Sequence, residues 1–170
     1  MTEDSKVYLA AYGLDDSPRN GYVATNFGSW TDILVLTDAT ANRGLTLFEL
    51  DATTCTTRNR QRFDTYEVFN DHDDRTQLFE ALESAAAGTI IVGVTADSSE
   101  NGVLFQNSAS SYFARYGMNL RGQGWRDKFV FIMQKGYPKK TVFQRKSRGG
   151  TSLFMTISLS GKLIVYRYLN

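Results

Sequence analysis

The sequence predicts a strand-dominated α+β domain: two antiparallel sheets packed as a sandwich, with two short flanking helices. Short segments rich in apolar residues, bounded by Gly, Asn, Asp and Ser, recur along the chain, as strands separated by turns do. Only two segments space their apolar residues as a helix does. The chain has nine Tyr and eleven Phe, residue types that are enriched in strands. Its 170 residues fit a single domain spanning 1–170.

The segments expected to be strands dominate the first 66 residues. Five segments have strand composition: 6–12, 21–27, 31–37, 45–50 and 61–66. The polar stretch 51–59 separates the last two, so we expect it to be the long loop of a hairpin.

The clearest helix is predicted over residues 73–87. Asp71 or Asp73 can cap its N-terminus, and Gly88 stands where a left-handed C-terminal cap is expected. The apolar residues that fall on one face of this helix are Leu78, Phe79, Leu82, Ala85 and Ala86.

The remaining elements alternate between buried strands and one short helix. Residues 89–94 (TIIVGV) and 128–134 are predicted to be buried strands, on either side of a helix over 108–116 that Gly117 closes. The C-terminal segment 151–170 is predicted to contain a hairpin that turns at Ser160-Gly161. The helix 108–116 is predicted to place three aromatic residues on one side: Tyr112, Phe113 and Tyr116.

Charge and hydropathy weigh against two classes of partner. The net charge is +1, whereas nucleic-acid binders usually carry a strongly basic face. No apolar run approaches the ~20 residues of a membrane span, so we expect no membrane insertion. The first six residues show no signal-peptide core, so we expect a cytosolic protein, another export route or a mature form.

The residue inventory predicts a non-enzyme without cofactor or metal. With only His72 and Cys55, no zinc site of His and Cys ligands can be built and no internal disulfide can form. Cys55 lies in a Thr-rich loop without a nearby base. The glycine motifs for phosphate binding and the GxSxG motif are missing. Paired carboxylates for glycoside cleavage stay open, because acids that meet only in space are invisible in a sequence.

Several short motifs occur in a characteristic order. They are NRGLTLFELD (42–51), RFDTYE (62–67), an amphipathic helix, GTIIVGVTAD (88–97), a Tyr/Phe helix ending in glycine, and GWRDKFVFIMQKG (124–136). In this order they resemble the ILEI domain family, over about residues 42–146 but not over 1–40 or the terminal hairpin. That family includes interleukin-like inducers of epithelial–mesenchymal transition, the stem domain of protein O-mannose N-acetylglucosaminyltransferase, and domains of cell-surface hyaluronan-processing proteins.

The resemblance implies a two-sheet sandwich with a non-catalytic role. In the glycosyltransferase stem domain, a sugar is held by the arginine of an RG motif, an acid that ends the strand after the helix, and the arginine of GWRD. The matching positions here are Arg43, Asp97 and Arg126. Because all three are present, we favour a lectin. The alternative is a secreted, cytokine-like signalling protein, but signalling members carry disulfides that a chain with one cysteine cannot form.

The residue types suit a neutral sugar of the N-acetylglucosamine or galactose type. Arginine offers fixed donors and aspartate only acceptors, so together they can hold adjacent hydroxyls. Trp125, Trp30 and Tyr137 are candidates to cover the apolar side of the ring, although Trp125 fits a core position equally well. Asp127 either joins the site or forms an ion pair with Arg126 that fixes the turn.

A single site of this kind binds a monosaccharide at about millimolar concentration, and lectins gain strength by presenting several copies. We therefore predict a homo-oligomer that contacts itself through the terminal segment LIVYRYLN and binds glycans or glycoconjugates. We expect it to act outside the cell or at the cell surface; a cytoplasmic location also fits the sequence.

Overall fold

The computed structural model describes residues 5–13, 22–25, 34–35, 43–51, 57–65, 74–97, 110–122, 126–146, 149–150, 153–160 and 163–165. Within these residues lie ten strands and two helices, which confirms the strand-dominated α+β class. The elements are β1 (Ser5–Gly13), β2 (Tyr22–Thr25), β3 (Leu34–Val35), β4 (Gly44–Leu50), β5 (Thr57–Phe63), α2 (Asp74–Ser84), β6 (Ile90–Asp97), α3 (Ser110–Ala114), β7 (Lys128–Gln134), β8 (Tyr137–Lys146), β9 (Leu153–Ser160) and β10 (Leu163–Val165).

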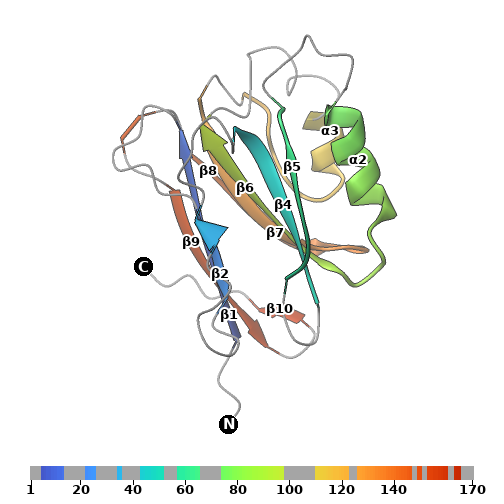
Figure 1. The fold of residues 1–170 in the computed structure, drawn as a ribbon. Helices are drawn as coiled ribbons and strands as arrows, with labels where there is room; N and C mark the ends of the chain where they lie inside the picture. The colour runs from blue at the N-terminus through green and yellow to red at the C-terminus, as the bar shows by residue number, and fades with distance from the viewer. Residues whose placement is uncertain are drawn as a thin grey trace.

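Strand pairing connects all ten strands. The path runs β10-β9-β1-β6-β4-β5, with β2 and β3 beside β1, and β7 and β8 beside β6. All pairs are antiparallel except β1 with β6, which are parallel where Tyr12 pairs with Ala96 and Gly13 with Asp97. Figure 1 shows that β1 and β6 end near one another at the top of the view. The predicted division into two separate sheets is not confirmed, because this junction joins the strands into one connected sheet.

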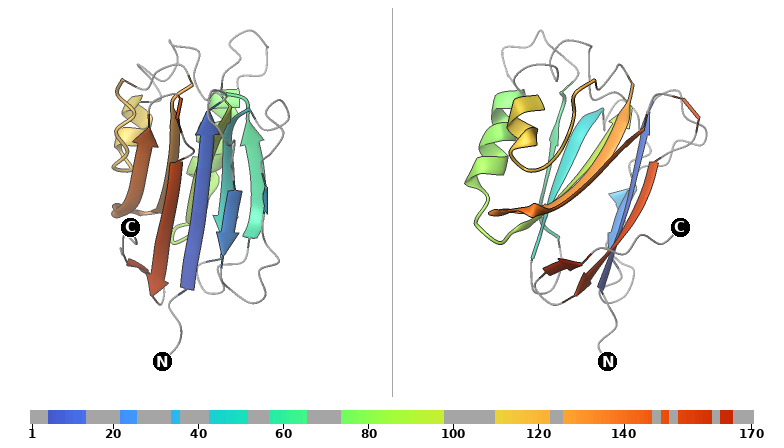
Figure 2. Two further views of the ribbon diagram at one scale, coloured as in Figure 1. Left: turned by 90° about the vertical axis from the view of Figure 1, so that its left-hand side faces the viewer. Right: turned by 180° about the vertical axis from the view of Figure 1, so that it is seen from behind.

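The core lies on both faces of β4, β6 and β7. Successive residues of a strand point to opposite faces. Val92 and Val130 therefore pack in one cluster with Leu9 of β1, while Ile91 and Phe131 pack in a second cluster under the helices. Figure 2 shows α2 and α3 on one side of these strands and β1 and β9 on the other. Burial on both faces explains why β6 and β7 are almost continuously apolar.

Both helices end earlier than predicted, α2 at Ser84 and α3 at Ala114. Leu78 and Leu82 of α2 are buried as expected, but the helix ends at Ser84. Gly88 has the expected left-handed conformation, with φ 89°, yet it lies beyond the helix end. Its N–H donates to the Lys135 carbonyl at 2.9 Å, so this glycine starts the turn into β6 and does not cap the helix.

Two strands differ from the prediction. β5 begins at Thr57, inside the stretch predicted to be a loop, and β8 was not predicted. In β5 every residue before Phe63 is exposed, so the strand carries no hydrophobic pattern. The start of β8 is polar and exposed as well, and it pairs with the apolar strand β7. The predicted C-terminal hairpin is confirmed, since β9 and β10 pair with Leu163 opposite Ser160.

Candidate functional site

The first predicted site residue, Arg43, is held in a two-pronged ion pair with Asp64. Arg43 precedes β4 and Asp64 follows β5; these strands are antiparallel with Leu45 opposite Phe63, so the two residues lie at the same end. Arg43 Nε donates to both carboxylate oxygens at 3.1 Å, and Nη2 donates to Oδ2 at 2.7 Å. The side chains are 24% and 18% exposed, so this is a partly buried, charge-assisted pair. This ion pair joins two of the sequence motifs, NRGL and RFDT, through residues that lie 21 positions apart.

Gly44 fixes the position of this pair. It has φ 99°, and a Cβ added to it would lie 2.1 Å from the Phe63 carbonyl oxygen and 2.9 Å from the Thr65 nitrogen. Both atoms belong to backbone, so a larger residue does not fit. The RG and FDT motifs are therefore two halves of one structural unit.

Arg62 strengthens the same unit. Its Nη1 donates to the Arg43 carbonyl at 2.9 Å and lies 3.7 Å from Asp64 Oδ2. The backbone and the side chain of Arg43 are thus both held by residues at the end of β5.

The backbone of Asp97 lies beside that of Arg43. Gly44 pairs with Ala96, and β6 ends at the next residue, Asp97, where β4 begins. The side chain of Asp97 lies outside the described residues.

Arg126 and Asp127 stand directly before β7, at the same end of the sheet. The start of β7 is bridged to β6 by a side chain: the Thr95 hydroxyl accepts from the Phe129 N–H at 2.9 Å and donates to its carbonyl at 3.1 Å. Arg126 has φ 61°, a left-handed conformation that costs a non-glycine residue about 1–2 kcal/mol. We call Arg43, Asp97 and Arg126 the strand-end site.

Lys128 anchors a second segment at this end. Its side chain is fully buried, and its Nζ donates to the Gly149 carbonyl at 3.3 Å. A lysine is almost never fully buried unless it is paired. This bond ties the segment after β8 to the start of β7, next to Arg126.

The aromatic candidates do not complete the strand-end site in the described part of the chain. Trp125 and Trp30 lie outside it. Tyr137 is exposed, but it pairs with Gln134 at the opposite end of β7 from Arg126. Tyr137 is therefore too far away to cover a sugar held there, and this prediction was wrong.

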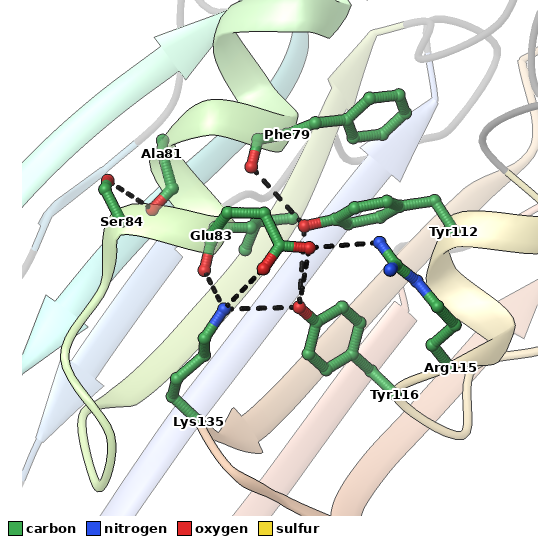
Figure 3. A network of polar contacts seen from close by, with 9 residues as sticks. Phe79, Ala81, Glu83, Ser84, Tyr112, Arg115, Tyr116 and Lys135 are labelled. Atoms are coloured by element: carbon green, nitrogen blue, oxygen red, sulfur yellow. Dashed lines mark hydrogen bonds and ion pairs between the residues drawn. The ribbon is translucent and has the colours of Figure 1, made fainter.

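A second polar cluster, which the sequence analysis missed, lies at the other end of β7 (Figure 3). Lys135 Nζ donates to the Leu82 carbonyl at 2.6 Å, to Glu83 Oε2 at 3.2 Å and to the Tyr116 hydroxyl at 3.3 Å. Arg115 Nη2 donates to Glu83 Oε1 at 3.0 Å. These contacts join α2, the segment after α3 and the β7–β8 turn.

Stacked rings complete this cluster. The Tyr112 ring stacks on Phe79 with centroids 4.3 Å apart, and the Arg115 guanidinium lies 4.3 Å from the centre of the same ring. We call Glu83, Tyr112, Arg115, Tyr116 and Lys135 the helix clasp. Its members are far apart in the chain, and only the tyrosines stood out, by their spacing in the predicted helix.

Two pKa values in the helix clasp are displaced. Hydrogen bonds from Tyr112 and Lys135 lower the pKa of Glu83. Burial raises the pKa of Tyr112, and hydrogen bonds to Tyr116 and Glu83 raise it further. The clasp thus combines a carboxylate that stays ionised with a phenol that stays protonated, as suits a structural contact between elements.

Neither a metal cluster nor a membrane-spanning helix is found among the described residues. They contain no group of three or more His, Cys, Asp or Glu residues placed to hold a metal ion. None of their helices has the length and apolar character that crossing a membrane requires. His72 and Cys55 lie outside the described residues.

Comparison with known proteins identifies the family. No curated protein matches the chain. The family model described as interleukin-like EMT inducer, ILEI, matches residues 43–137, which is more than half of the sequence. The match begins at Arg43, includes β4 to β7 with both described helices, and ends at Tyr137. This chain therefore belongs to the ILEI family.

Proposed function

We propose that this ILEI-family domain is a non-catalytic lectin that binds a neutral sugar at the strand-end site. The observation that carries the proposal is the register of the strands. Arg43 stands where β4 begins, Asp97 where β6 ends, and Arg126 just before β7, all at one end of the sheet. Two guanidinium donors and one carboxylate acceptor in this arrangement suit vicinal hydroxyls.

The contacts of Arg43 support a binding role. Its guanidinium is fixed by Asp64 and its carbonyl by Arg62. A donor that is already ordered loses less side-chain freedom when a ligand arrives, so binding costs less. The ion pair therefore both stabilises the fold and prepares the donor.

The backbone of Arg126 offers a second argument. Glycine would adopt φ 61° without strain, yet an arginine occupies the position. Strained residues gather at functional sites, where the gain in function offsets the cost in stability. An arginine that binds ligand explains why this turn lacks glycine.

Sugar binding is tested by calorimetric titration with N-acetylglucosamine and galactose. We expect one of these two sugars to bind with a dissociation constant of about a millimolar. The variants Arg43→Ala, Asp97→Ala and Arg126→Ala should each weaken binding about tenfold or more, because each loses a charge-assisted hydrogen bond. Lys139→Ala, at an exposed position near the other end of β7, is the matched control and should bind normally.

Two further measurements separate this proposal from its alternatives. Asp64→Asn keeps the guanidinium of Arg43 but holds it less firmly. The sugar affinity of this variant should therefore fall less than that of Arg43→Ala. A chelator should change nothing, because the proposed site is metal-independent. Sugar binding that survives all three site variants would refute the lectin; saturable binding to a receptor protein that no sugar inhibits would support the cytokine-like alternative.

We also propose that the lectin acts as a homo-oligomer, outside the cell or at its surface. A weak monovalent site needs several copies to hold a glycan. Light scattering coupled to size exclusion measures the subunit number, and a strictly monomeric protein would contradict this part of the proposal.

A further inference from the structure

Strand β5 presents arginines at alternate positions. Its sequence is TRNRQRF, and the six residues Thr57 to Arg62 are all exposed, while only Phe63 is buried. We call Arg58, Arg60 and Arg62 the arginine row. Alternate residues of a strand lie about 6.8 Å apart along its axis. No hydrophobic burial explains a strand of this composition.

The register places two members of the row on one face. Arg60 pairs with Phe48 and Arg62 with Thr46, whereas Gln61 pairs with Leu47 and points to the other face. A register shift follows, and beyond it Thr57 pairs with Leu50. Arg58 lies at this irregularity, is 64% exposed, and forms an ion pair with Asp51. Bulges at sheet edges commonly re-aim a side chain in this way.

β5 is also an edge strand. It ends the path of paired strands, and among the described strands only β4 pairs with it. Figure 2, left, shows β5 at the outer margin of its strand group. Such an edge offers a row of backbone N–H and C=O groups to an incoming strand.

The charge of the row decides which strand can pair with it. A second copy of β5 in antiparallel pairing would set arginine against arginine in every other register, and like charges directly opposite are destabilising. An incoming strand with Asp or Glu at alternate positions can set acids opposite Arg60 and Arg62, where guanidinium and carboxylate bond in two-pronged fashion.

The surroundings of the row disfavour a continuous polyanion. Asp51 and Asp64 lie beside the row, within ion-pair distance of Arg58 and Arg62 respectively. Their charges repel an anion that runs unbroken along the strand. The net charge of +1 also gives little of the long-range attraction on which nucleic-acid binding depends.

We propose that the outer edge of β5 binds an extended acidic peptide segment of a partner protein, which adds as a strand with its acids opposite the arginine row. In this mode, main-chain hydrogen bonds supply affinity and alternate side chains supply specificity. The proposal does not rest on sugar binding. Arg62 belongs to both places, since it also holds the Arg43 carbonyl, so the test changes Arg60 instead.

The test uses the full chain and a fluorescently labelled six-residue peptide that alternates Thr and Glu. We expect saturable binding by fluorescence anisotropy, and binding at least about tenfold weaker for a peptide of the same composition with three Glu followed by three Thr. Arg60→Gln should weaken binding about two- to fivefold, and Arg60→Glu should abolish it. Gln61→Ala, on the opposite face of the same strand, is the matched control.

Two N-methylated peptides, each blocked at one alternate set of amides, distinguish strand addition from simple charge attraction. One of the two should lose binding, because only one set of amides faces β5. Slower amide hydrogen exchange in β5 on peptide addition would support the proposal independently of any variant. No binding, equal binding of both N-methylated peptides, or tighter Arg60-dependent binding of a sulfated oligosaccharide would overturn it.

Discussion

The Arg43–Asp64 pair and the Arg115–Glu83 pair of the helix clasp stand at opposite ends of the central strands and are built from similar charged groups, but they differ in burial. Arg43 and Asp64 are 24% and 18% exposed, whereas Glu83 and Arg115 are 50% and 59% exposed. Gly44, which packs against the backbone of Phe63 and Thr65, fixes the position of the first pair. The second pair joins α2 to the segment after α3 at the surface. Because water screens exposed charges, only the partly buried pair is expected to contribute strongly to stability.

The largest effect is expected from Gly44→Ala. The added Cβ would collide with the Phe63 carbonyl, and the left-handed φ adds further strain. We expect a loss of roughly 3–5 kcal/mol in the free energy of unfolding, measured by chemical denaturation. Gly122→Ala is the control, because Gly122 has φ 76° with open space around it and should lose only about 1–2 kcal/mol. Equal losses at both positions would show that the contact does not matter.

A double-mutant cycle on Arg43 and Asp64 should give a coupling energy of about 1.5–3 kcal/mol, as for hydrogen bonds to charged groups. The same cycle on Arg115 and Glu83 should give no measurable coupling, since both side chains are well exposed. If the two cycles agree, burial is not what distinguishes the two ends.

Arg126→Gly should be more stable than Arg126→Ala by about 1 kcal/mol, because glycine adopts the left-handed conformation without strain. Both variants lose the guanidinium, so both should lose sugar binding. Denaturation curves and sugar titration of the two proteins separate backbone strain from ligand contact. A glycine variant that is no more stable would contradict the strain.

The smallest effect concerns pH. The pKa of Glu83 lies below its ordinary value of 4.5, so the folded state favours the ionised carboxylate. Its contribution to stability is present above that ordinary value and is lost as pH falls through the lowered pKa. Glu83→Gln should therefore flatten part of the decline in stability below about pH 4.5, measured by denaturation across an acid series.

Tyr112 should make the stability of the protein depend on pH in the opposite direction. Its pKa is raised, so the folded state favours the protonated phenol, and its contribution is lost as pH rises above 10.0, the ordinary value. The ultraviolet absorbance of phenolate counts the tyrosines that ionise only at high pH. Tyr112→Phe should have one fewer such tyrosine than the unmodified protein. An unchanged count would contradict the burial of this hydroxyl.

The sequence predicted best the elements that are buried on both faces. The predicted bounds of β7 match the structure, because its apolar run leaves no other interpretation. β5 and β8 were misjudged or missed because they form by pairing with neighbouring strands and not by burying a pattern of their own. Hydrogen-bonded pairing leaves no periodic signal in a single sequence.

The site was only half predictable. Arg43 was identified through its motif, but its partner Asp64 lies 21 residues away and belongs to another motif. The order of motifs identified the family without showing that RG and FDT meet. Likewise, nothing in the sequence indicated that Lys135 reaches the end of α2.

The junction of β1 with β6 has a consequence for how such domains can be excised. The family-matched segment 43–137 contains β4 to β7, yet the valines on one face of β6 are sealed by Val7 and Leu9 of β1. A recombinant fragment cut at the family boundaries would expose that apolar face to water, and the fragment would be prone to aggregate. In this chain the N-terminal strand β1 is therefore part of the hydrophobic core on which the family-matched segment depends.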